Sequence, residues 1–391
     1  MTHYRYLIIG GGMAADAAVR GIRKVDAQGS VGLIGAEPDA PYDRPPLSKG
    51  LWKGRPVDRV WRHTDKLGLD LHLGIQASHL DAGLHRVIDD QGAEYTYDRL
   101  LLATGGDPIR LLGSPEEVIY FRTLQDYRNL RQLAEANERF IVIGGGFIGS
   151  EIAAALANLG KQVTMLFVED GVGARIFPAN LAGFLNEIYR SHGVEVLTNE
   201  TVASIVKNAE GLQITTRSGR TLQAEAVVAG LGIRPNVKLA RQAGLAVENG
   251  ILVNSLLQTS NPDIFAAGDV ISYFSEALQV RMRVEHEDNA NTSGMLAGQA
   301  LAGNPTPYNQ LSFFYSDLFD LSYEAVGELN PAYQVVEDWQ ETYRKGVLYY
   351  LHQGRVRGVL LWNIWQKVNA ARALIAESGP FSVADLPGKI K

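Results

Sequence analysis

Cysteine is absent from this sequence of 391 residues. Disulfide reductases and thiol-based peroxidases work through a cysteine thiolate or a redox-active cysteine pair, so the isolated chain has neither chemistry. Zinc and iron–sulfur centres that are held by cysteine are excluded for the same reason. The eight histidines are scattered and form no His-x-x-x-His pair, so we expect no metal site.

Long apolar runs and blocks of like charge are also missing. No uninterrupted apolar stretch approaches the roughly 18 residues that a membrane-spanning helix needs. The net charge is −6 without a basic cluster, so nucleic acid is not an expected partner. The first apolar run begins within a few residues of Met1, which leaves no room for a signal or transit peptide. We therefore expect a soluble, cytoplasmic protein without a membrane span.

The chain does have a doubled glycine-rich signature. Apolar runs end in three glycines at residues 10–12 and again at residues 144–146, and an alanine-rich segment follows each. This order of strand, glycine turn and helix binds the pyrophosphate of a dinucleotide, with the helix N-terminus facing the anion. One such loop is a weak signal. Two in one chain predict two bound dinucleotides and electron transfer between them.

The two halves of the chain resemble each other beyond these loops. A helix over 13–24 and a strand over 31–37 follow the first loop, and a strand over 162–169 follows the second. Each strand ends on an acid, at the position that binds an adenosine ribose. Later segments, 194–197 and 211–217, are expected to form antiparallel strands. The repeated order predicts an internal duplication.

Beyond a linker at 303–307 the pattern changes to short β runs. A hairpin is predicted to turn at 352–355, and a last helix over about 364–377 closes the chain. Trp362 and Trp365 are expected in the core of this region.

Several motifs carry a family resemblance. They are Tyr42-x-Arg44-Pro-Pro-Leu-Ser-Lys49, Thr104-Gly-Gly, the segment 144–151 and Gly268-Asp269. With them the chain resembles the FAD-dependent, NAD(P)H-oxidising flavoproteins of the pyridine nucleotide-disulfide oxidoreductase superfamily. Within it, the chain resembles the group of apoptosis-inducing factor and the reductases of ferredoxins and rubredoxins. The segments 284–286, 322–327, 345–351 and 361–364 are more similar to apoptosis-inducing factor.

The resemblance implies an α/β fold with two Rossmann-like dinucleotide-binding domains and a C-terminal α+β domain. The expected boundaries are 1–114 with 235–304 for FAD binding, 115–234 for NAD binding, and 305–391 for the C-terminal domain. The cofactors implied are FAD and NADH. The long C-terminal insertion of the mitochondrial proteins is missing, so no role in cell death is implied.

On the FAD side, the glycine fingerprint and the resemblance together predict a set of contacts. Alternatives remain for some of them: Glu37 and Arg122 would otherwise be solvated, and His286 would be a helix cap or a surface group. Tyr315 stands where both groups tend to have tryptophan. The predicted contacts are Gly10, Gly12, Ala15, Glu37, Arg44, Lys49, Ala77, Thr104, Arg122, Asp269, Glu285, His286 and Tyr315.

On the NAD side, Glu169 is expected to select the cofactor. Its carboxylate accepts from a ribose 2′-hydroxyl and repels a 2′-phosphate by roughly 4 kcal/mol per charge pair at 4 Å and an effective dielectric constant near 20. Asp170 adds to the repulsion, and Arg175 is the nearby cation that would counter it. We predict NADH over NADPH. The predicted contacts are Gly144, Gly146, Phe147, Ile148, Gly149, Glu169, Gly232 and Glu324.

Four residues are predicted to act in catalysis: Lys49, Glu151, Phe147 and His286. The Lys49 ammonium would stabilise negative charge on a reduced flavin, and the resemblance pairs it with Glu151. Phe147 resembles a gate that stacks on the nicotinamide. The alternatives are a surface lysine, a first-turn helix acid favoured by the helix dipole, and ordinary packing of the phenylalanine.

The resulting hypothesis is hydride transfer from NADH to FAD, followed by electron transfer to an external acceptor such as a quinone, an iron–sulfur or rubredoxin-type carrier, or oxygen. One alternative is a dedicated ferredoxin or rubredoxin reductase, whose docking rim would include Arg281, Arg283, Arg355 and Arg357. Another is a slow NADH sensor that holds a charge-transfer complex and changes its assembly state. A homodimer is compatible with each.

Overall fold

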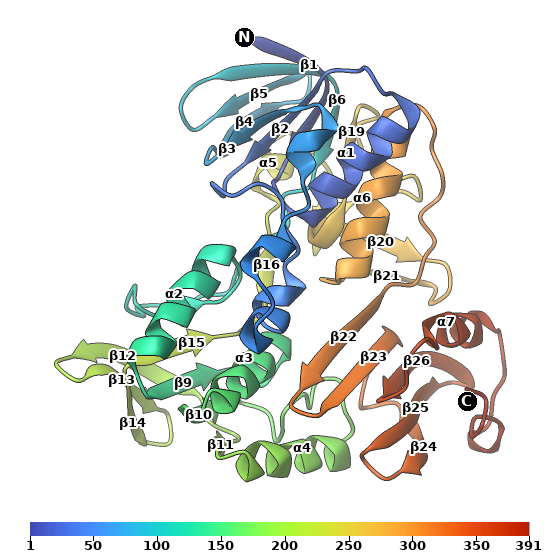
Figure 1. Ribbon diagram of the computed structural model, residues 1–391. Helices are drawn as coiled ribbons and strands as arrows, with labels where there is room; N and C mark the ends of the chain where they lie inside the picture. The colour runs from blue at the N-terminus through green and yellow to red at the C-terminus, as the bar shows by residue number, and fades with distance from the viewer. Residues whose placement is uncertain (391) are drawn as a thin grey trace. The chain divides into compact units, whose positions relative to one another are not determined.

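The computed structural model describes residues 1–390. The chain divides into two compact units, and each unit is assembled from separate stretches of chain (Figure 1). The first unit contains Met1–Asp43, Pro56–Asp107 and Arg234–Ser312, and the second contains Arg44–Arg55, Pro108–Ile233 and the chain from Phe313 onward. The unit boundaries at 107/108 and 233/234 lie near the expected domain boundaries at 114/115 and 234/235. The division into three domains stays a prediction.

A seven-stranded sheet organises the first unit, in the order β3-β2-β1-β6-β5-β4 with β19 paired to β6. Strands β1, β2, β3, β6 and β19 are parallel, and β4 and β5 extend the sheet in antiparallel fashion. The bounds are β1 Thr2–Ile9, β2 Val31–Gly35, β3 Asp70–Leu73, β4 Ala77–Asp81, β5 Arg86–Asp89, β6 Glu94–Leu102 and β19 Ile264–Ala266.

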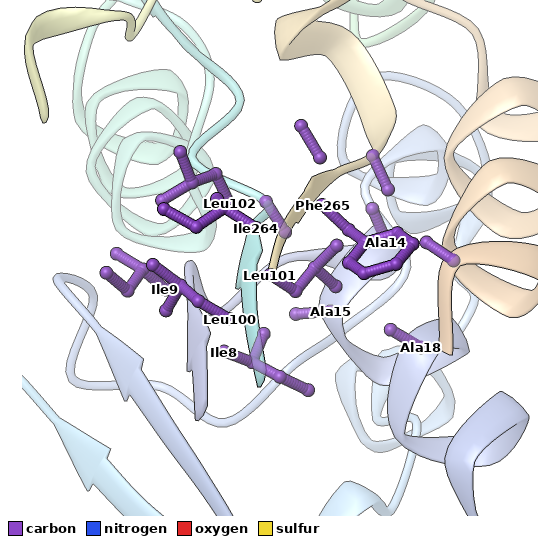
Figure 2. Packing of buried hydrophobic residues seen from close by; sticks show 14 of the residues in the cluster. Ile8, Ile9, Ala14, Ala15, Ala18, Leu100, Leu101, Leu102, Ile264 and Phe265 are labelled. Carbon is purple, nitrogen blue, oxygen red and sulfur yellow. The ribbon is translucent and has the colours of Figure 1, made fainter. Parts of the chain in front are cut away.

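Helices α1 (Met13–Val25) and α6 (Glu287–Leu301) cross closely in this unit. A Cβ on Gly298 would lie 2.0 Å from the Ala18 carbonyl oxygen, so this crossing requires glycine. Strand and helix side chains, Leu101 and Phe265 among them, form the buried core beside α1 (Figure 2). Burial of such apolar surface is the main stabilising contribution to the unit. Its smaller elements are β17 Val247–Glu248, β18 Gly250–Leu252, β20 Ile271–Ser275, β21 Val280–Met282, α5 Lys238–Gln242 and short 3₁₀ turns at Val57–Val60, Thr64–Leu67 and Gly268–Val270.

A parallel five-stranded sheet, in the order β11-β10-β9-β15-β8, organises the first part of the second unit. Residues 195–197 were expected in an antiparallel strand, but they pair with β10 in parallel, so that prediction is wrong. The reason is the intervening helix α4, which returns the chain to the same end of the sheet. The bounds are β8 Ile119–Tyr120, β9 Arg139–Ile143, β10 Gln162–Leu166, β11 Glu195–Leu197, β15 Ala226–Ala229, α2 Leu124–Ala136, α3 Phe147–Asn158 and α4 Ala179–Ser191.

Two antiparallel sheets complete this unit. One contains β12 Val202–Asn208, β13 Gly211–Thr216 and β14 Thr221–Ala224. The C-terminal one has the order β22-β23-β26-β25-β24, and its predicted hairpin turns at residues 353–354, between β25 and β26. Its bounds are β22 Phe313–Leu318, β23 Leu321–Gly327, β24 Gln334–Glu341, β25 Lys345–His352 and β26 Arg355–Trp362. Short turns at Pro45–Leu47, Gly50–Lys53 and Val383–Asp385 also belong to this unit.

The last helix, α7 (Val368–Ala376), begins later than expected. Asn363 and Gln366 have positive φ angles of 49° and 63°, which a right-handed helix does not allow. Trp362 is fully buried, as expected, but Trp365 lies in this irregular segment and is 49% exposed. The prediction that Trp365 belongs to the core is therefore wrong.

Two short paired strands, β7 (Gly106–Pro108) and β16 (Ile233–Pro235), contain the points where the chain passes from one unit to the other. Within residues 1–390, no helix combines the length and the apolar character that crossing a bilayer demands.

Candidate dinucleotide and redox site

The first glycine of each loop makes a turn that no other residue would tolerate. Gly10 and Gly144 have φ angles of 122° and 110°. A Cβ would lie 2.1 Å from the Ala103 carbonyl oxygen at Gly10, and 2.3 Å from that of Gly230 at Gly144. Each loop therefore packs its backbone directly against the residue just past the end of a neighbouring strand, β6 for Gly10 and β15 for Gly144.

The third glycine of each loop has the opposite surroundings. Gly12 and Gly146 are the N-cap residues of α1 and α3, and neither provides a side-chain cap. A Cβ on either would meet no atom within 4 Å. The first N–H groups of each helix have no intrahelical partner, so each loop leaves a cradle that suits a pyrophosphate.

Small residues complete the two cradles. Ala15 is fully buried in the first turn of α1. Gly149 occupies the same place in α3, where a Cβ would lie 1.9 Å from the Gly144 oxygen. Ile148 directly precedes Gly149 in that turn and is half-buried. These residues let each helix approach its loop, as a dinucleotide fingerprint requires.

The two predicted ribose-binding acids each lie just past the strand that follows a glycine loop and its helix. Glu37 follows β2 and accepts a hydrogen bond of 2.5 Å from the Tyr42 hydroxyl. Glu169 follows β10 and forms an ion pair with Arg175, whose Nε lies 2.5 Å from Oε1. Neither acid is simply solvated.

The remaining residues of the first unit that were predicted to contact FAD come from several elements. Ala77 is buried at the start of β4. Thr104 donates its hydroxyl to the Asn236 carbonyl at 2.8 Å. Asp269 lies in the turn after β19, and Glu285 forms an ion pair of 2.9 Å with Arg283.

His286 is the N-cap residue of α6, but it forms no side-chain cap, so the capping alternative is wrong. Burial lowers its pKa to about 4, although the nearby Asp269 carboxylate acts in the opposite direction. The imidazole is therefore neutral at neutral pH and offers one N–H donor and one acceptor rather than a charge.

The second unit contains the predicted ion pair. Lys49 Nζ lies 2.7 Å from Glu151 Oε1, and their side chains are only 13% and 2% exposed. Ser48 donates to Glu151 Oε2 at 2.5 Å, and Ser316 donates to Oε1 at 2.5 Å. Both carboxylate oxygens therefore have partners. The alternative of a surface lysine and an isolated helix acid is wrong.

The negative charge of Glu151 also affects a neighbouring tyrosine. Burial, followed by the negative charge of Glu151, raises the pKa of Tyr323 well above its usual value. A small pocket opens beside the pair and is lined by residues that include Trp52, Asn158 and Asp317. The pair thus has protein on most sides and a solvent-accessible edge on one.

One aromatic ring lies over the lysine of the pair, and another begins the helix that carries Glu151. The Lys49 ammonium lies 5.2 Å from the centroid of the Tyr315 ring. Phe147, the first residue of α3, is 41% exposed and meets Phe314 edge-on, with the ring centroids 5.2 Å apart. An exposed ring with one aromatic neighbour is not ordinary core packing.

Glu324 lies directly opposite Tyr315 in the β22–β23 pair. Burial raises the pKa of its carboxyl group, and the Gln366 backbone N–H opposes that shift. Its Oε2 is a buried atom without a hydrogen-bond partner. Because buried polar atoms are nearly always satisfied, this oxygen suits a ligand.

Three predicted residues lie elsewhere in the second unit. Arg44 donates from Nη1 to the Arg122 carbonyl at 2.9 Å, so these two predicted FAD contacts are neighbours. Gly232 is exposed, has a φ of 87°, and accepts from the Ile109 N–H at 2.9 Å. Across residues 1–390, no group of metal-ligating side chains has the arrangement of a metal site.

Sequence reasoning missed Ser48 and Ser316. They lie 103 and 165 residues from Glu151 along the chain. The sequence offered one signal for these serines, which is that each is adjacent to a predicted site residue. Ser48 directly precedes Lys49, and Ser316 directly follows Tyr315. Since strand neighbours face opposite sides of a sheet, Ser316 was a candidate for a different contact from Tyr315.

Comparison with known proteins agrees with this geometry. A family model described as pyridine nucleotide-disulphide oxidoreductase matches residues 4–294. A second model, of the C-terminal region of mitochondrion-associated apoptosis-inducing factor, matches residues 330–377. The chain therefore belongs to the pyridine nucleotide-disulphide oxidoreductase family.

Relatives that match nearly all of this chain include a ferredoxin reductase subunit and an apoptosis-inducing factor. The ferredoxin reductase subunit of 5,5′-dehydrodivanillate O-demethylase from Sphingobium sp. is 34% identical, over 96% of this chain and 94% of that one. Mitochondrial apoptosis-inducing factor 1 from Dictyostelium discoideum is 32% identical, over 96% of this chain and 79% of that one. A covalent putidaredoxin reductase–putidaredoxin complex contains a similar structure, with a TM-score of 0.89, 29% identity, and coverage of 96% and 94%.

These findings confirm the predicted family and the α/β fold with two Rossmann-like sheets and a C-terminal antiparallel sheet. The chain is an oxidoreductase, similar to the NAD(P)H-dependent flavoprotein reductases of ferredoxins and to apoptosis-inducing factor. Proteins of this family bind FAD and NAD(P)H. The open cradles at Gly12 and Gly146 fit two such dinucleotides.

Proposed function

We propose that this chain oxidises NADH with FAD as its resident cofactor and delivers the electrons to a small ferredoxin-type iron–sulfur protein. One observation carries the proposal: two open glycine cradles at helix N-termini occur in a chain without cysteine. Without a thiol relay, electrons leave the flavin directly for an external acceptor. The names of two relatives, a ferredoxin reductase subunit and putidaredoxin reductase, support an iron–sulfur carrier.

When bound, FAD supplies two-electron acceptance from a nicotinamide and release of single electrons, which a one-electron carrier requires. The chain supplies binding and orientation. We assign the pyrophosphates to the two cradles, FAD at Gly12 and the nicotinamide nucleotide at Gly146. Glu37 and Glu169 then bind the adenosine riboses from the strand ends, where acids of the fingerprint accept hydroxyl protons.

Lys49 is the proposed electrostatic residue. A positive charge that is fixed in advance stabilises negative charge developing nearby, without reorganisation at the moment of reaction. Glu151 holds the ammonium at 2.7 Å, and Ser48 and Ser316 hold the carboxylate at 2.5 Å each. Three side chains, Glu151 directly and Ser48 and Ser316 through it, thus fix the position of one positive charge.

Phe147 is the proposed gate. Its ring is 41% exposed and has an edge contact with Phe314. Because the residue is already 41% exposed, a rotation about its χ1 angle would uncover less apolar surface than the same rotation of a fully buried ring. His286, neutral because burial lowers its pKa to about 4, would offer a ligand a hydrogen bond rather than a positive charge.

Two of the four arginines proposed for a basic docking rim are neutralised by ion pairs. Arg283 and Arg357 are 11% and 13% exposed and form ion pairs of 2.9 Å with Glu285 and Glu328. Rim charges mainly set association rates and their salt dependence. We therefore expect carrier reduction by this chain to depend weakly on ionic strength.

The test begins with the purified, FAD-loaded protein. Under anaerobic conditions, NADH should bleach the flavin absorbance, and the reduced protein should then reduce a [2Fe–2S] ferredoxin faster than it reduces rubredoxin, a quinone or oxygen. A colourless protein that takes up no FAD would overturn the whole proposal. Rapid bleaching followed by transfer to a quinone or oxygen, but not to any iron–sulfur carrier, would overturn the carrier assignment alone.

A second function is favoured by the match of residues 330–377 to the C-terminal region of apoptosis-inducing factor. In that case the chain would be a slow NADH sensor. Reduction by NADH would give a persistent long-wavelength absorbance, slow reoxidation by every acceptor, and a change in size-exclusion volume. Fast turnover with ferredoxin and an unchanged volume would exclude the sensor.

A further inference from the structure

We propose that Arg62 and Arg20 strengthen FAD binding by neutralising the charge of Asp16, an acid in the first turn of α1. The inference rests on the proposed function, which assigns the FAD pyrophosphate to the cradle at Gly12. Asp16 is fully buried, and its N–H donates to the Gly12 carbonyl oxygen at 3.2 Å. An acid in the first turn interacts favourably with the helix dipole. For the same reason, its uncompensated charge would weaken the attraction of that helix end for a phosphate.

The carboxylate of Asp16 accepts four hydrogen bonds. Arg20 donates from Nε to Oδ2 at 2.9 Å and from Nη2 to Oδ1 at 3.2 Å. Arg62 donates from Nε to Oδ2 at 2.7 Å, and the Thr64 hydroxyl donates to Oδ1 at 2.7 Å. Burial alone would raise the pKa of Asp16, but the hydrogen bonds from Arg20 and Thr64 and the charge of Arg62 outweigh burial and lower this pKa. Asp16 is therefore a buried carboxylate whose charge is matched by two guanidinium groups.

Arg62 is held in place on its other sides as well. Its Nη1 donates to Asp43 Oδ1 at 2.6 Å, and its Nη2 donates to Asn291 Oδ1, in α6, at 2.8 Å. The side chain is only 15% exposed, and the Arg62 carbonyl oxygen accepts from Arg20 Nη2 at 2.6 Å. A planar guanidinium can make these bonds in three directions at once, which a lysine ammonium cannot match in geometry. The cluster holds two acids and two arginines, so the loss of Arg62 would leave it with net negative charge.

The helix after the second glycine loop has a neutral residue at the corresponding place. Ser150 directly follows Gly149 in α3, as Asp16 directly follows Ala15 in α1. Ser150 is 4% exposed, and its hydroxyl donates to the Phe147 carbonyl oxygen at 2.9 Å. A neutral serine requires no compensating cation. The charge cluster therefore belongs to the cradle that we assign to the resident cofactor, and its arginines are expected to act on FAD rather than on the nicotinamide nucleotide.

The experiment measures how tightly the loaded protein holds FAD. The FAD-loaded protein is diluted in steps, and the fluorescence of the released flavin gives the dissociation constant. R62M should weaken FAD binding by about tenfold, which lies within the range of charge effects at helix ends. D16N should bind FAD at least as tightly as the wild-type protein, and D16N/R62M should recover most of the loss. If the network were merely structural, each substitution would weaken FAD binding and the double variant would bind it most weakly.

Arg20 keeps the test decisive if R62M fails to fold. Its side chain is 38% exposed, so R20M is a milder change, and it should weaken FAD binding by at least about threefold, whereas R20K should retain most of the affinity.

Arg5 gives the matched control. It pairs at 2.9 Å with Asp26, the C-cap residue at the opposite end of α1, so R5M should leave the affinity for FAD unchanged. A D16N variant that loses FAD as readily as R62M, or arginine variants without effect, would overturn this inference alone. A wild-type protein that takes up no FAD would overturn the proposed function, and this inference with it.

Discussion

Replacing Glu151 with alanine removes the acceptor on which three donors converge. Lys49 would keep a charge with a side chain only 13% exposed, and the hydroxyls of Ser48 and Ser316 would lose acceptors at 2.5 Å. Removing one member of a buried ion pair costs about 3–5 kcal/mol, because an uncompensated charge stays behind. Each hydrogen bond to a charged group is worth about 1.5–3 kcal/mol.

Simple addition of these contributions overshoots, because they share one carboxylate and residues in contact are not additive. The pocket beside the pair also admits water to part of it. We therefore expect E151A to lower the free energy of unfolding by about 3–5 kcal/mol. Urea denaturation of the FAD-loaded protein measures this as a lower midpoint with an unchanged slope.

Two further variants separate charge from packing. In K49M/E151L both charges are replaced by apolar groups of similar volume, and such replacements are often neutral or stabilising. The double variant should therefore be more stable than E151A. Glu138 gives a surface control: it pairs with Lys161 at 2.9 Å but is 66% exposed, so E138A should cost at most about 1 kcal/mol. An E151A penalty no larger than that of E138A would refute the reasoning.

Three other outcomes follow from the geometry. A Cβ on Gly12 meets no atom within 4 Å, whereas one on Gly10 lies 2.1 Å from a carbonyl oxygen; G12V should fold and fail to retain FAD, and G10V should fail to fold, as circular dichroism and flavin absorbance would report. F147A should alter the rate of flavin bleaching by NADH and change the free energy of unfolding by no more than about 1 kcal/mol, since the ring is 41% exposed. An unchanged rate would exclude the gate. Burial lowers the pKa of His286 from 6.5 to about 4, so the unfolded chain binds more protons between these values and stability falls as the pH drops from 6.5 towards 4. H286Q should reduce this loss of stability at acid pH. A loss as large as that of the wild-type protein would contradict the lowered pKa of His286.

Local pattern predicted much of the backbone correctly. Glycine spacing predicted both loops, because only glycine adopts the positive φ of Gly10 and Gly144. Acids at strand ends indicated Glu37 and Glu169, and a glycine between alternating residues indicated the hairpin at 353–354. The failures were also local. The sequence of residues 195–197 carries no signal for strand direction, because the intervening helix decides it. The sequence around Trp365 is apolar enough for a helix, but an irregular turn interrupts it and exposes the tryptophan.

By itself the sequence determined the family, the two dinucleotide cradles and the exclusion of thiol chemistry, since each depends on residue identity and short spacing. Tertiary structure alone decided which side chains meet. Ser48 and Ser316 reach Glu151 across 103 and 165 residues of chain, and a pairwise contact at such a separation leaves no periodic trace. Residues close in sequence also need the tertiary structure to meet. Arg175 lies six residues after Glu169 and forms a hydrogen bond to its carboxylate, and the turn between them is held by the Gly173 N–H, which donates to the Gly145 carbonyl oxygen.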